Sequence, residues 1–243
     1  MSETPDELPV IYRDDRYIAI HKPSGLLVHR SPIDKRETRF AIQVLRDQIG
    51  QKVYPVHRLD RPVSGLLLFA LDEEALSAGM KLFEERAVQK TYLAIVRGWT
   101  EAEGRIDSPL AKFEDQDARR KSSETQDALT SFQTLATSEL PYPTDRYATS
   151  RYSLVRLHPH TGRRHQLRRH LAHIRHPIIG DTRYGDNTAN KHARLHFSIE
   201  RNLLASTELA FRHPFSAQQL ELACPLDEAF QVASRKLGLR LAR

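Results

Sequence analysis

The stretch Pro55-Val56-His57-Arg58-Leu59-Asp60-Arg61-Pro62-Val63-Ser64-Gly65-Leu66 changes from dense charge to apolar character just before the apolar run Leu66–Leu71. That run has the length of one buried strand. The carboxylate of Asp60 therefore belongs to a loop at the edge of a hydrophobic core. Partial burial and positive neighbours could make it a base or a nucleophile, but a plain loop ion pair would use the same residues. Local physics leaves both interpretations open.

The segments around this loop predict an α+β fold. Apolar runs that are partly adjacent and partly separated by helices indicate a mixed, mainly antiparallel central sheet flanked by helices and loops. Asp72 is a suitable N-cap for an amphipathic helix over residues 72–86. The buried face of that helix is predicted from helical spacing to contain Leu76, Met80, Phe83 and Ala87. The charged segment Lys112–Asp127 predicts a flexible loop or an exposed hairpin.

Composition limits the class of protein. Cys224 is the only cysteine among 243 residues, which excludes an internal disulfide and a cysteine-based zinc site and suits a reducing compartment. The segment Met1–Pro9 is acidic and lacks the apolar core of a signal peptide, and no run approaches the length of a membrane span. We therefore expect a cytoplasmic protein with no membrane association.

Positive charge is concentrated in one part of the chain. The net charge is +6, and Arg156–His176 contains six arginines, six histidines and no acidic residue. Such a cluster attracts phosphate groups, and arginine also makes bidentate contacts with them. Nucleic-acid binding is the functional interpretation, and a solvated basic face is the alternative.

The segment Thr161–His170 refines this interpretation. A helix is predicted over Arg164–Ile174, with Gly162 permitting a tight turn into it. Arg163 and Arg164 would then lie near the positive end of the helix, where phosphate is held well. Arg168 follows directly after the apolar Leu167, at the margin of the buried stripe. Its side chain could pair with a buried carboxylate.

Other cofactor chemistry is disfavoured. The histidines near this helix have no accompanying carboxylate ligand and several arginine neighbours, so we expect no metal site: His165, His170, His173 and His176. Glycine-rich nucleotide loops and the Gly-x-Ser-x-Gly pattern of hydrolases are both absent from the sequence. We therefore expect no nucleotide cofactor.

Four motifs in order resemble the RluA family of pseudouridine synthases. His57–Gly65 is similar to its H-R-L-D-x-x-T-S-G signature, and His21–Gly25 is similar to its first motif. Lys90–Gly98 resembles the strand with the active-site tyrosine, and Thr161–His170 resembles the third motif. Two departures are visible, because Val63 replaces the usual Thr and His21 replaces the more common Asn.

The resemblance implies roles for individual residues. Asp60 would be the essential carboxylate, Tyr92 would stack on the target base near C5, and Arg168 would pair with Asp60. Arg58 would fill the gap left by the flipped base. The remaining residues implied to bind RNA are Lys22, Arg163, Arg164, His165, Leu167 and Arg169, with Leu167 lining the pocket.

The resemblance also implies the organisation and the substrate. Residues 1–243 would form a single pseudouridine synthase catalytic domain without a separate N-terminal RNA-binding domain. Val28–Ser31 and Arg46–Gln51 look closest to members that act on uridine 65 of tRNA. We therefore expect a monomer that flips and isomerises a uridine of tRNA without a cofactor. Three alternatives remain: a ribosomal RNA synthase of the same family, a non-catalytic RNA-binding protein, and a hydrolase that releases uracil.

Overall fold

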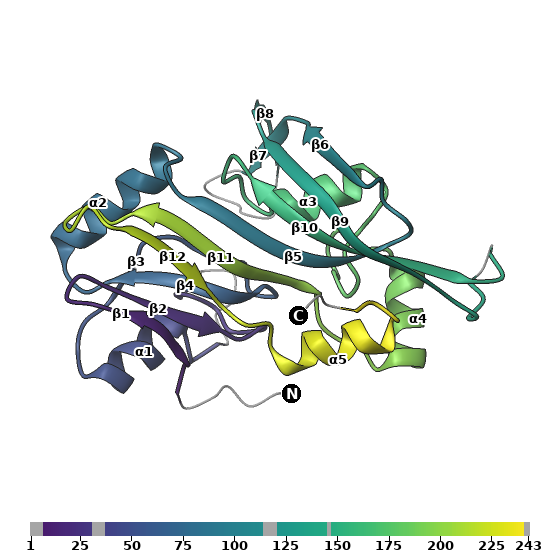
Figure 1. Cartoon of the computed structure of the whole chain (residues 1–243), viewed down its shortest axis with the longest axis horizontal. Helices are drawn as coiled ribbons and strands as arrows, with labels where there is room; N and C mark the ends of the chain where they lie inside the picture. The colour runs from purple at the N-terminus through teal and green to yellow at the C-terminus, as the bar shows by residue number, and fades with distance from the viewer. Residues whose placement is uncertain (1–6, 31–36, 114–120, 145–146, 241–243) are drawn as a thin grey trace. The chain divides into compact units, whose positions relative to one another are not determined.

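The computed structural model describes residues 7–30, 37–113, 121–144 and 147–240 (Figure 1). The chain divides into two compact units, and each is described by itself. Unit 1 comprises Met1–Lys90 and Ala205–Leu226, and unit 2 comprises Thr91–Leu204 and Asp227–Arg243.

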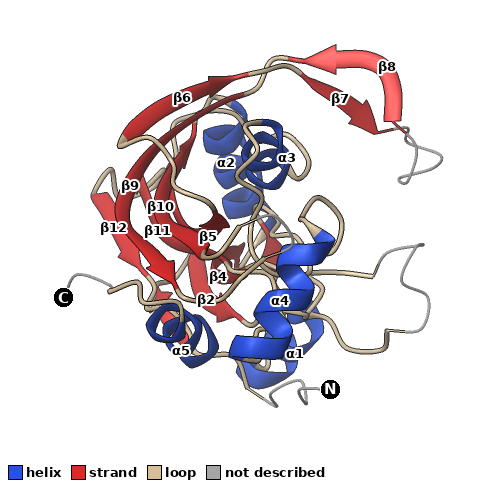
Figure 2. Cartoon of the chain, turned by 90° about the vertical axis from the view of Figure 1, so that its right-hand side faces the viewer, coloured by secondary structure: helices blue, strands red, loops and turns tan. Residues whose placement is uncertain are grey.

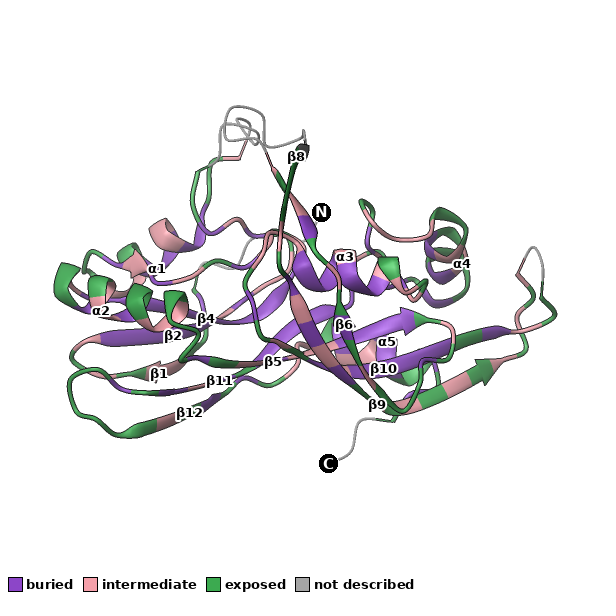
Figure 3. Cartoon of the chain, turned by 90° about the horizontal axis from the view of Figure 1, so that it is seen from above, coloured by how far each residue is buried: buried purple, intermediate pink, exposed green. Residues whose placement is uncertain are grey.

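The sheet of unit 1 is centred on β4 (Ser64–Ala70). Every residue of β4 is buried, as the apolar run predicts (Figure 3). β2 (Tyr17–Lys22) pairs antiparallel with β4, and β1 (Val10–Arg13) pairs antiparallel with β2. The short β3 (Tyr54–Pro55) also pairs antiparallel with β4, so the chain enters the Asp60 loop from one strand of this sheet and leaves it into another.

The remaining strands of unit 1 make the sheet mixed. β11 (Leu204–Arg212) runs parallel to β4, and β12 (Gln219–Ala223) pairs antiparallel with β11. The parallel contact depends on Gly65, which has a φ of +105°. A Cβ on Gly65 would lie 2.0 Å from the carbonyl oxygen of Ser206, so only glycine permits this approach of the two backbones.

The helices of unit 1 are α1 (Ala41–Ile49) and α2 (Glu73–Glu84). The predicted N-cap of α2 is confirmed, since the Asp72 side chain accepts the N–H of Ala75 at 2.8 Å. The buried face predicted for this helix is partly wrong. Met80 is 44% exposed, and Ala87 lies beyond the helix and is exposed.

The buried positions of α2 are instead its smallest side chains, Ala75 and Gly79. A Cβ on Gly79 would lie 2.8 Å from the Val56 side chain, so α2 approaches its neighbours most closely at these two residues. This close contact rotates the larger side chains Leu76 and Phe83 to the margin of the core, where they are partly buried. Periodicity selects apolar residues but does not reveal such a close approach.

Unit 2 contains an antiparallel sheet in the order β5–β10–β9–β6. Its strands are β5 (Gln89–Arg97), β10 (Ser150–Pro159), β9 (Leu129–Leu140) and β6 (Glu103–Asp107). The predicted α+β class with a mixed, mainly antiparallel sheet is confirmed across the two units.

A second, two-stranded sheet in unit 2 occupies much of the charged segment Lys112–Asp127. β7 (Leu110–Phe113) pairs antiparallel with β8 (Lys121–Gln126). This pairing supports the hairpin alternative, while residues 114–120 of the segment lie outside the described residues.

The helices of unit 2 are α3 (Gln166–His173), α4 (Asn187–Phe197) and α5 (Glu228–Lys236). α3 lies beside β10 (Figure 2). It begins later than the predicted Arg164, because His165 has a left-handed φ of 56° that no α-helix accommodates. Within the described residues, every helix is too short or too polar to span a bilayer.

Candidate active site

Asp60 lies in a tight turn between β3 and β4 of unit 1. The N–H of Val63 donates to the carbonyl oxygen of Asp60 at 3.0 Å, which closes the turn. The Asp60 side chain is half-buried, and Arg58 is exposed. Arg61 forms an ion pair with Glu37 at 2.5 Å. The carboxylate is thus presented at the edge of the core, as the sequence predicts.

A second loop, Pro23–Leu26, is tied to this turn through its backbone. The N–H of Gly25 donates to the carbonyl oxygen of Arg61 at 2.8 Å, and Arg61 Nε donates to the carbonyl oxygen of Gly25 at 3.0 Å. Ser24 Oγ donates to the carbonyl oxygen of Pro62 at 2.8 Å. The first and second sequence motifs therefore form one structure.

Lys22 contributes to the same structure from the end of β2. Its side chain is fully buried, and Nζ donates to the carbonyl oxygens of Pro23 and Leu26 at 2.8 Å and of Arg61 at 3.3 Å. A contact between Lys22 and phosphate, as the resemblance implies, would have to replace these hydrogen bonds. The geometry gives Lys22 the function of joining the two loops.

His57 anchors the opposite end of the Asp60 turn. Its Nε2 accepts the N–H of Leu68 at 3.1 Å, and its ring stacks on Phe83 with centroids 4.7 Å apart. Burial, together with the nearby Lys90, lowers the pKa of His57 from 6.5 to about 3. The imidazole is therefore neutral at pH 7. Sequence reasoning gave His57 no separate function, although it is the first residue of the signature.

Tyr92 and Leu167 belong to unit 2. Tyr92 lies on β5, opposite Leu157 of β10, and is half-buried. Leu167 is in the first turn of α3 and only 7% exposed. Their predicted contacts with the flipped base stay predictions.

Arg168 of α3 forms a buried, bidentate ion pair with Asp181. Its Nε lies 2.6 Å from Oδ2 of Asp181, and its NH2 lies 2.9 Å from Oδ1. Burial raises the pKa of Asp181, but the Arg168 guanidinium and two backbone N–H donors lower it to below its usual value. The sequence predicts a carboxylate partner for Arg168 but did not identify Asp181. The pairing of Arg168 with Asp60 stays a prediction, since the two residues belong to different units.

Four other basic residues near α3 gather at one aromatic ring. The guanidinium carbons of Arg164, Arg169 and Arg183 lie 4.4, 5.4 and 5.3 Å from the centre of Phe113. The His165 ring meets the same phenyl ring edge-on at 5.5 Å. We call these five residues the Phe113 cluster. Sequence reasoning missed Phe113 and Arg183, since neither belongs to a motif.

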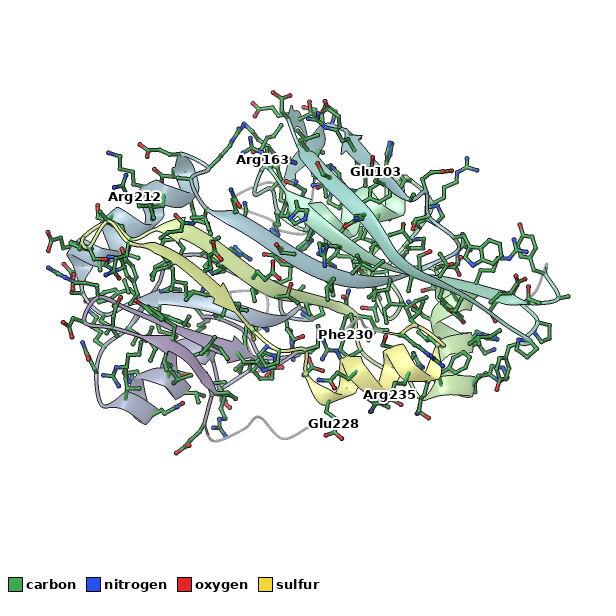
Figure 4. The ribbon with its side chains drawn as sticks, in the orientation of Figure 1. Glu103, Arg163, Arg212, Glu228, Phe230 and Arg235 are labelled. Carbon is green, nitrogen blue, oxygen red and sulfur yellow. The ribbon has the colours of Figure 1, made fainter. Side chains whose placement is uncertain are left out.

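Arg163 is held differently, by the backbone. Its Nε donates to the carbonyl oxygen of Asp127 at 3.0 Å, and its N–H donates to the Gln166 side chain at 3.0 Å (Figure 4). Both the side chain and the backbone of Arg163 therefore fix the loop before α3.

The described residues contain no group of three His, Cys, Asp or Glu side chains placed to hold a metal ion. The donors near α3 are mostly guanidinium groups, which bind anions. Unit 2 therefore presents a surface suited to phosphate groups, and unit 1 presents a carboxylate on a rigid turn.

Comparisons with known proteins agree with the motifs. Residues 16–173 match the family model described as RNA pseudouridylate synthase. The chain is 50% identical over 230 residues to tRNA pseudouridine synthase C of Vibrio parahaemolyticus, covering 93% of this chain and 94% of the relative. It is also 50% identical over 234 residues to the protein of the same name from Haemophilus ducreyi, covering 96% of each.

A solved structure shares the fold. Human RNA pseudouridylate synthase domain containing 4 superimposes with a TM-score of 0.74 at 25% identity, over 97% of this chain and 95% of that one.

Proposed function

Since the chain belongs to the RNA pseudouridylate synthase family, it is an isomerase that converts uridine to pseudouridine, and we propose that its substrate is uridine 65 of tRNA. The choice of tRNA rests on the 50% identity to tRNA pseudouridine synthase C, which extends over nearly the whole length of this chain and of the relatives. The basic surface of unit 2 fits an RNA substrate in general, because nucleic acids are bound largely through phosphate contacts.

The reaction breaks the bond between N1 of uracil and C1′ of ribose, and forms a bond between C5 and C1′. The proton on C5 is lost and N1 gains one, so the product is an isomer of the substrate. No electrons and no groups are exchanged with a second reactant. We therefore propose that the enzyme works without a nucleotide or redox cofactor.

Asp60 is the proposed catalytic carboxylate. Three chemical functions fit this assignment: attack on the sugar, attack on the base, and removal of the ribose 2′ proton. Each requires a carboxylate at a fixed position, which the turn closed by Val63 supplies. Arg168 is the proposed cationic partner of this carboxylate, and Tyr92 is the proposed partner of the flipped base.

The RNA must place its target base outside the helical stack. Unstacking costs on the order of a few kcal/mol, which phosphate contacts have to offset. We assign these contacts to Arg163, Arg164, His165 and Arg169. We assign filling of the vacated space to Arg58, whose exposed side chain follows directly after the anchored His57. Leu167 is the proposed apolar wall of the pocket.

We propose that residues 1–243 act together as a single catalytic domain and as a monomer in the cytoplasm. The matched family region, residues 16–173, includes parts of both units, and so do the proposed catalytic residues. Either unit expressed by itself should then be inactive.

Pseudouridine mapping in total RNA from cells with and without this chain tests the substrate. We expect one tRNA position to lose its pseudouridine when the chain is absent. Loss in ribosomal RNA with tRNA intact would instead establish the alternative substrate of the same family.

Purified Asp60→Asn protein tests the mechanism. We expect no turnover and nearly unchanged tRNA binding, because the amide keeps the shape but cannot act as a base or nucleophile. Asp15→Asn is the matched control, since Asp15 is an exposed aspartate of the same unit and should retain full activity. Substantial turnover by Asp60→Asn would falsify the catalytic assignment.

A further inference from the structure

The loop after α3 contains a carboxylate, that of Asp181, which accepts four hydrogen bonds. Asp181 is 1% exposed and accepts from Nε and NH2 of Arg168. Its Oδ1 also accepts the backbone N–H groups of Arg183 and Tyr184, at 2.9 and 3.0 Å. A carboxylate with this many donors has little freedom to rotate.

The backbone of the same loop is equally constrained. The carbonyl oxygen of Asp181 accepts the N–H of Gly185 and Nδ2 of Asn190, both at 2.9 Å. The N–H of Gly180 donates to Oδ1 of Asn190 at 2.7 Å. A Cβ on Gly185 would lie 2.0 Å from the Asp181 carbonyl oxygen, so the loop closes around Asp181 only with glycine at that position.

The Arg168 guanidinium also lies over an aromatic ring. Its central carbon lies 5.1 Å from the ring centre of Tyr184. The Tyr184 hydroxyl is in turn hydrogen-bonded to Nδ1 of His165 at 2.8 Å. Arg168 is therefore held by a carboxylate at one edge and by an aromatic ring that is itself fixed.

The ion pair with Asp181 fixes the orientation of the whole Arg168 guanidinium. An arginine has five N–H donors in one plane, and Asp181 uses one on Nε and one on NH2. The plane is thereby fixed, and both N–H groups of NH1 point away from Asp181. A bidentate partner of this kind sets the direction of the remaining donors as well as the charge of the group.

We propose that Asp181 is a positioning residue, which orients Arg168 for catalysis and offsets the cost of burying its charge. This proposal rests on the proposed function, in which Arg168 is the cationic partner of the catalytic carboxylate. Asp181 touches neither the substrate nor the reacting atoms. It acts through Arg168.

The test is the kinetics of Asp181→Asn with tRNA as substrate. The amide oxygen can still accept from Arg183, Tyr184 and NH2 of Arg168, but the amide NH₂ group then faces the Nε donor of Arg168. We expect kcat to fall by about 10- to 100-fold, since small misplacements of catalytic groups cost that much. KM should change by less than about twofold, because the phosphate contacts remain.

Asp227→Asn is the matched control. Asp227 forms an ion pair with Arg201 at 2.5 Å in the same unit and caps α5, so the same substitution should lower thermal stability without lowering kcat. A double-mutant comparison separates positioning from general structure. In an Arg168→Lys background, Asp181→Asn should cause little further loss of kcat.

A wild-type kcat for Asp181→Asn overturns the inference, and so does an equal loss of kcat with and without the Arg168→Lys change. If Asp181→Asn does not fold, Asp181→Glu replaces it. Glu keeps the charge but displaces the guanidinium by one methylene, so kcat should still fall, and a wild-type kcat overturns the inference again. Activity of Asp60→Asn in the same assay would contradict the proposed function. An inactive Asp60→Asn with a fully active Asp181→Asn would contradict only the function of Asp181.

Discussion

Each unit buries one cation of the candidate site, and the two cations are held in different ways. Lys22 of unit 1 is fully buried and donates to three backbone carbonyl oxygens. Arg168 of unit 2 is 5% exposed and pairs with the carboxylate of Asp181. Lys22 is therefore held by main-chain atoms, and Arg168 is held by one side chain.

The difference separates two ways of building a site. Carbonyl acceptors at Pro23, Leu26 and Arg61 belong to two loops, so the ammonium of Lys22 fixes where the backbone of both loops runs. The carboxylate of Asp181 belongs to a loop that is already fixed by its own hydrogen bonds, so it fixes the orientation of one guanidinium. Damage to the first should appear mainly as lost stability, whereas damage to the second should also appear as lost turnover.

The largest stability effect is expected for Lys22→Met. Methionine fills most of the space but removes the ammonium donor from three carbonyl oxygens, and each oxygen left buried and unsatisfied costs about 1 to 3 kcal/mol. Removal of the ammonium also removes its desolvation cost, so we expect a net loss of about 3 kcal/mol in the free energy of unfolding. Chemical denaturation followed by circular dichroism measures it.

Lys112→Met is the control for this prediction. Lys112 also donates to an oxygen, that of Glu124 at 2.6 Å, but both side chains are largely exposed. Such surface pairs contribute about 0 to 1 kcal/mol. Equal losses of unfolding free energy in the two variants would contradict the prediction that the buried hydrogen bonds of Lys22 stabilise the fold more than an exposed ion pair does.

A smaller effect, visible only as a pH dependence, is expected at His57. The folded chain holds this imidazole neutral, with its pKa lowered to about 3, while the unfolded chain titrates it at 6.5. As the pH falls below 6.5, the unfolded chain therefore binds a proton that the folded chain does not, and stability is lost. The contribution is fully present above pH 6.5 and declines by up to about 1.4 kcal/mol per pH unit towards pH 3.

His57→Gln isolates this contribution. Glutamine can still accept the N–H of Leu68 but does not titrate. We expect similar stability at pH 7.5 and a shallower loss of stability between pH 6.5 and 5 than in the unmodified chain. An identical pH slope in both proteins would show that the anchor of the Asp60 turn is not a neutral imidazole.

The sequence predicts the elements that local patterns encode. The buried strand β4 and the cap at Asp72 follow from an apolar run and from one side chain beside a helix, and both are confirmed. α4 was not predicted, because its residues are mostly polar and its N-cap Asp186 lies outside any apolar pattern. The exposure of Met80 was not predicted either, since it depends on how closely Gly79 approaches Val56.

The residues of the candidate site also differ in whether the sequence alone identifies them. Asp60, Tyr92 and Arg168 could be identified from the sequence because motifs record residues that act directly. The contacts of Asp181 and Phe113 could not, because they join separate segments of the chain. The residues that hold a site in place are therefore found from tertiary contacts, and the residues that act in it from the sequence.

The smallest effect, a change in the affinity for tRNA, is expected from Phe113→Leu. This substitution tests the side-chain contacts of the Phe113 cluster in unit 2. Phe113 lies near three guanidinium groups, and each such contact contributes about 0.5 to 1 kcal/mol at an exposed site. Leucine removes the ring but none of the charges. We expect the Kd for tRNA to rise by about 3- to 10-fold, because Arg164, Arg169 and Arg183 are no longer held together before the RNA binds.

The salt dependence of binding distinguishes this explanation from a loss of charge. The logarithm of the binding constant should keep its slope against the logarithm of salt concentration, since the number of phosphate contacts is unchanged. Trp99→Leu is the control. The guanidinium carbon of Arg151 lies 4.1 Å from the ring centre of Trp99, outside the Phe113 cluster, so this substitution should leave the Kd unchanged. An unaltered Kd in Phe113→Leu would mean that the arginines are ordered without the ring, whereas a shallower slope would mean that Phe113 maintains the phosphate contacts themselves.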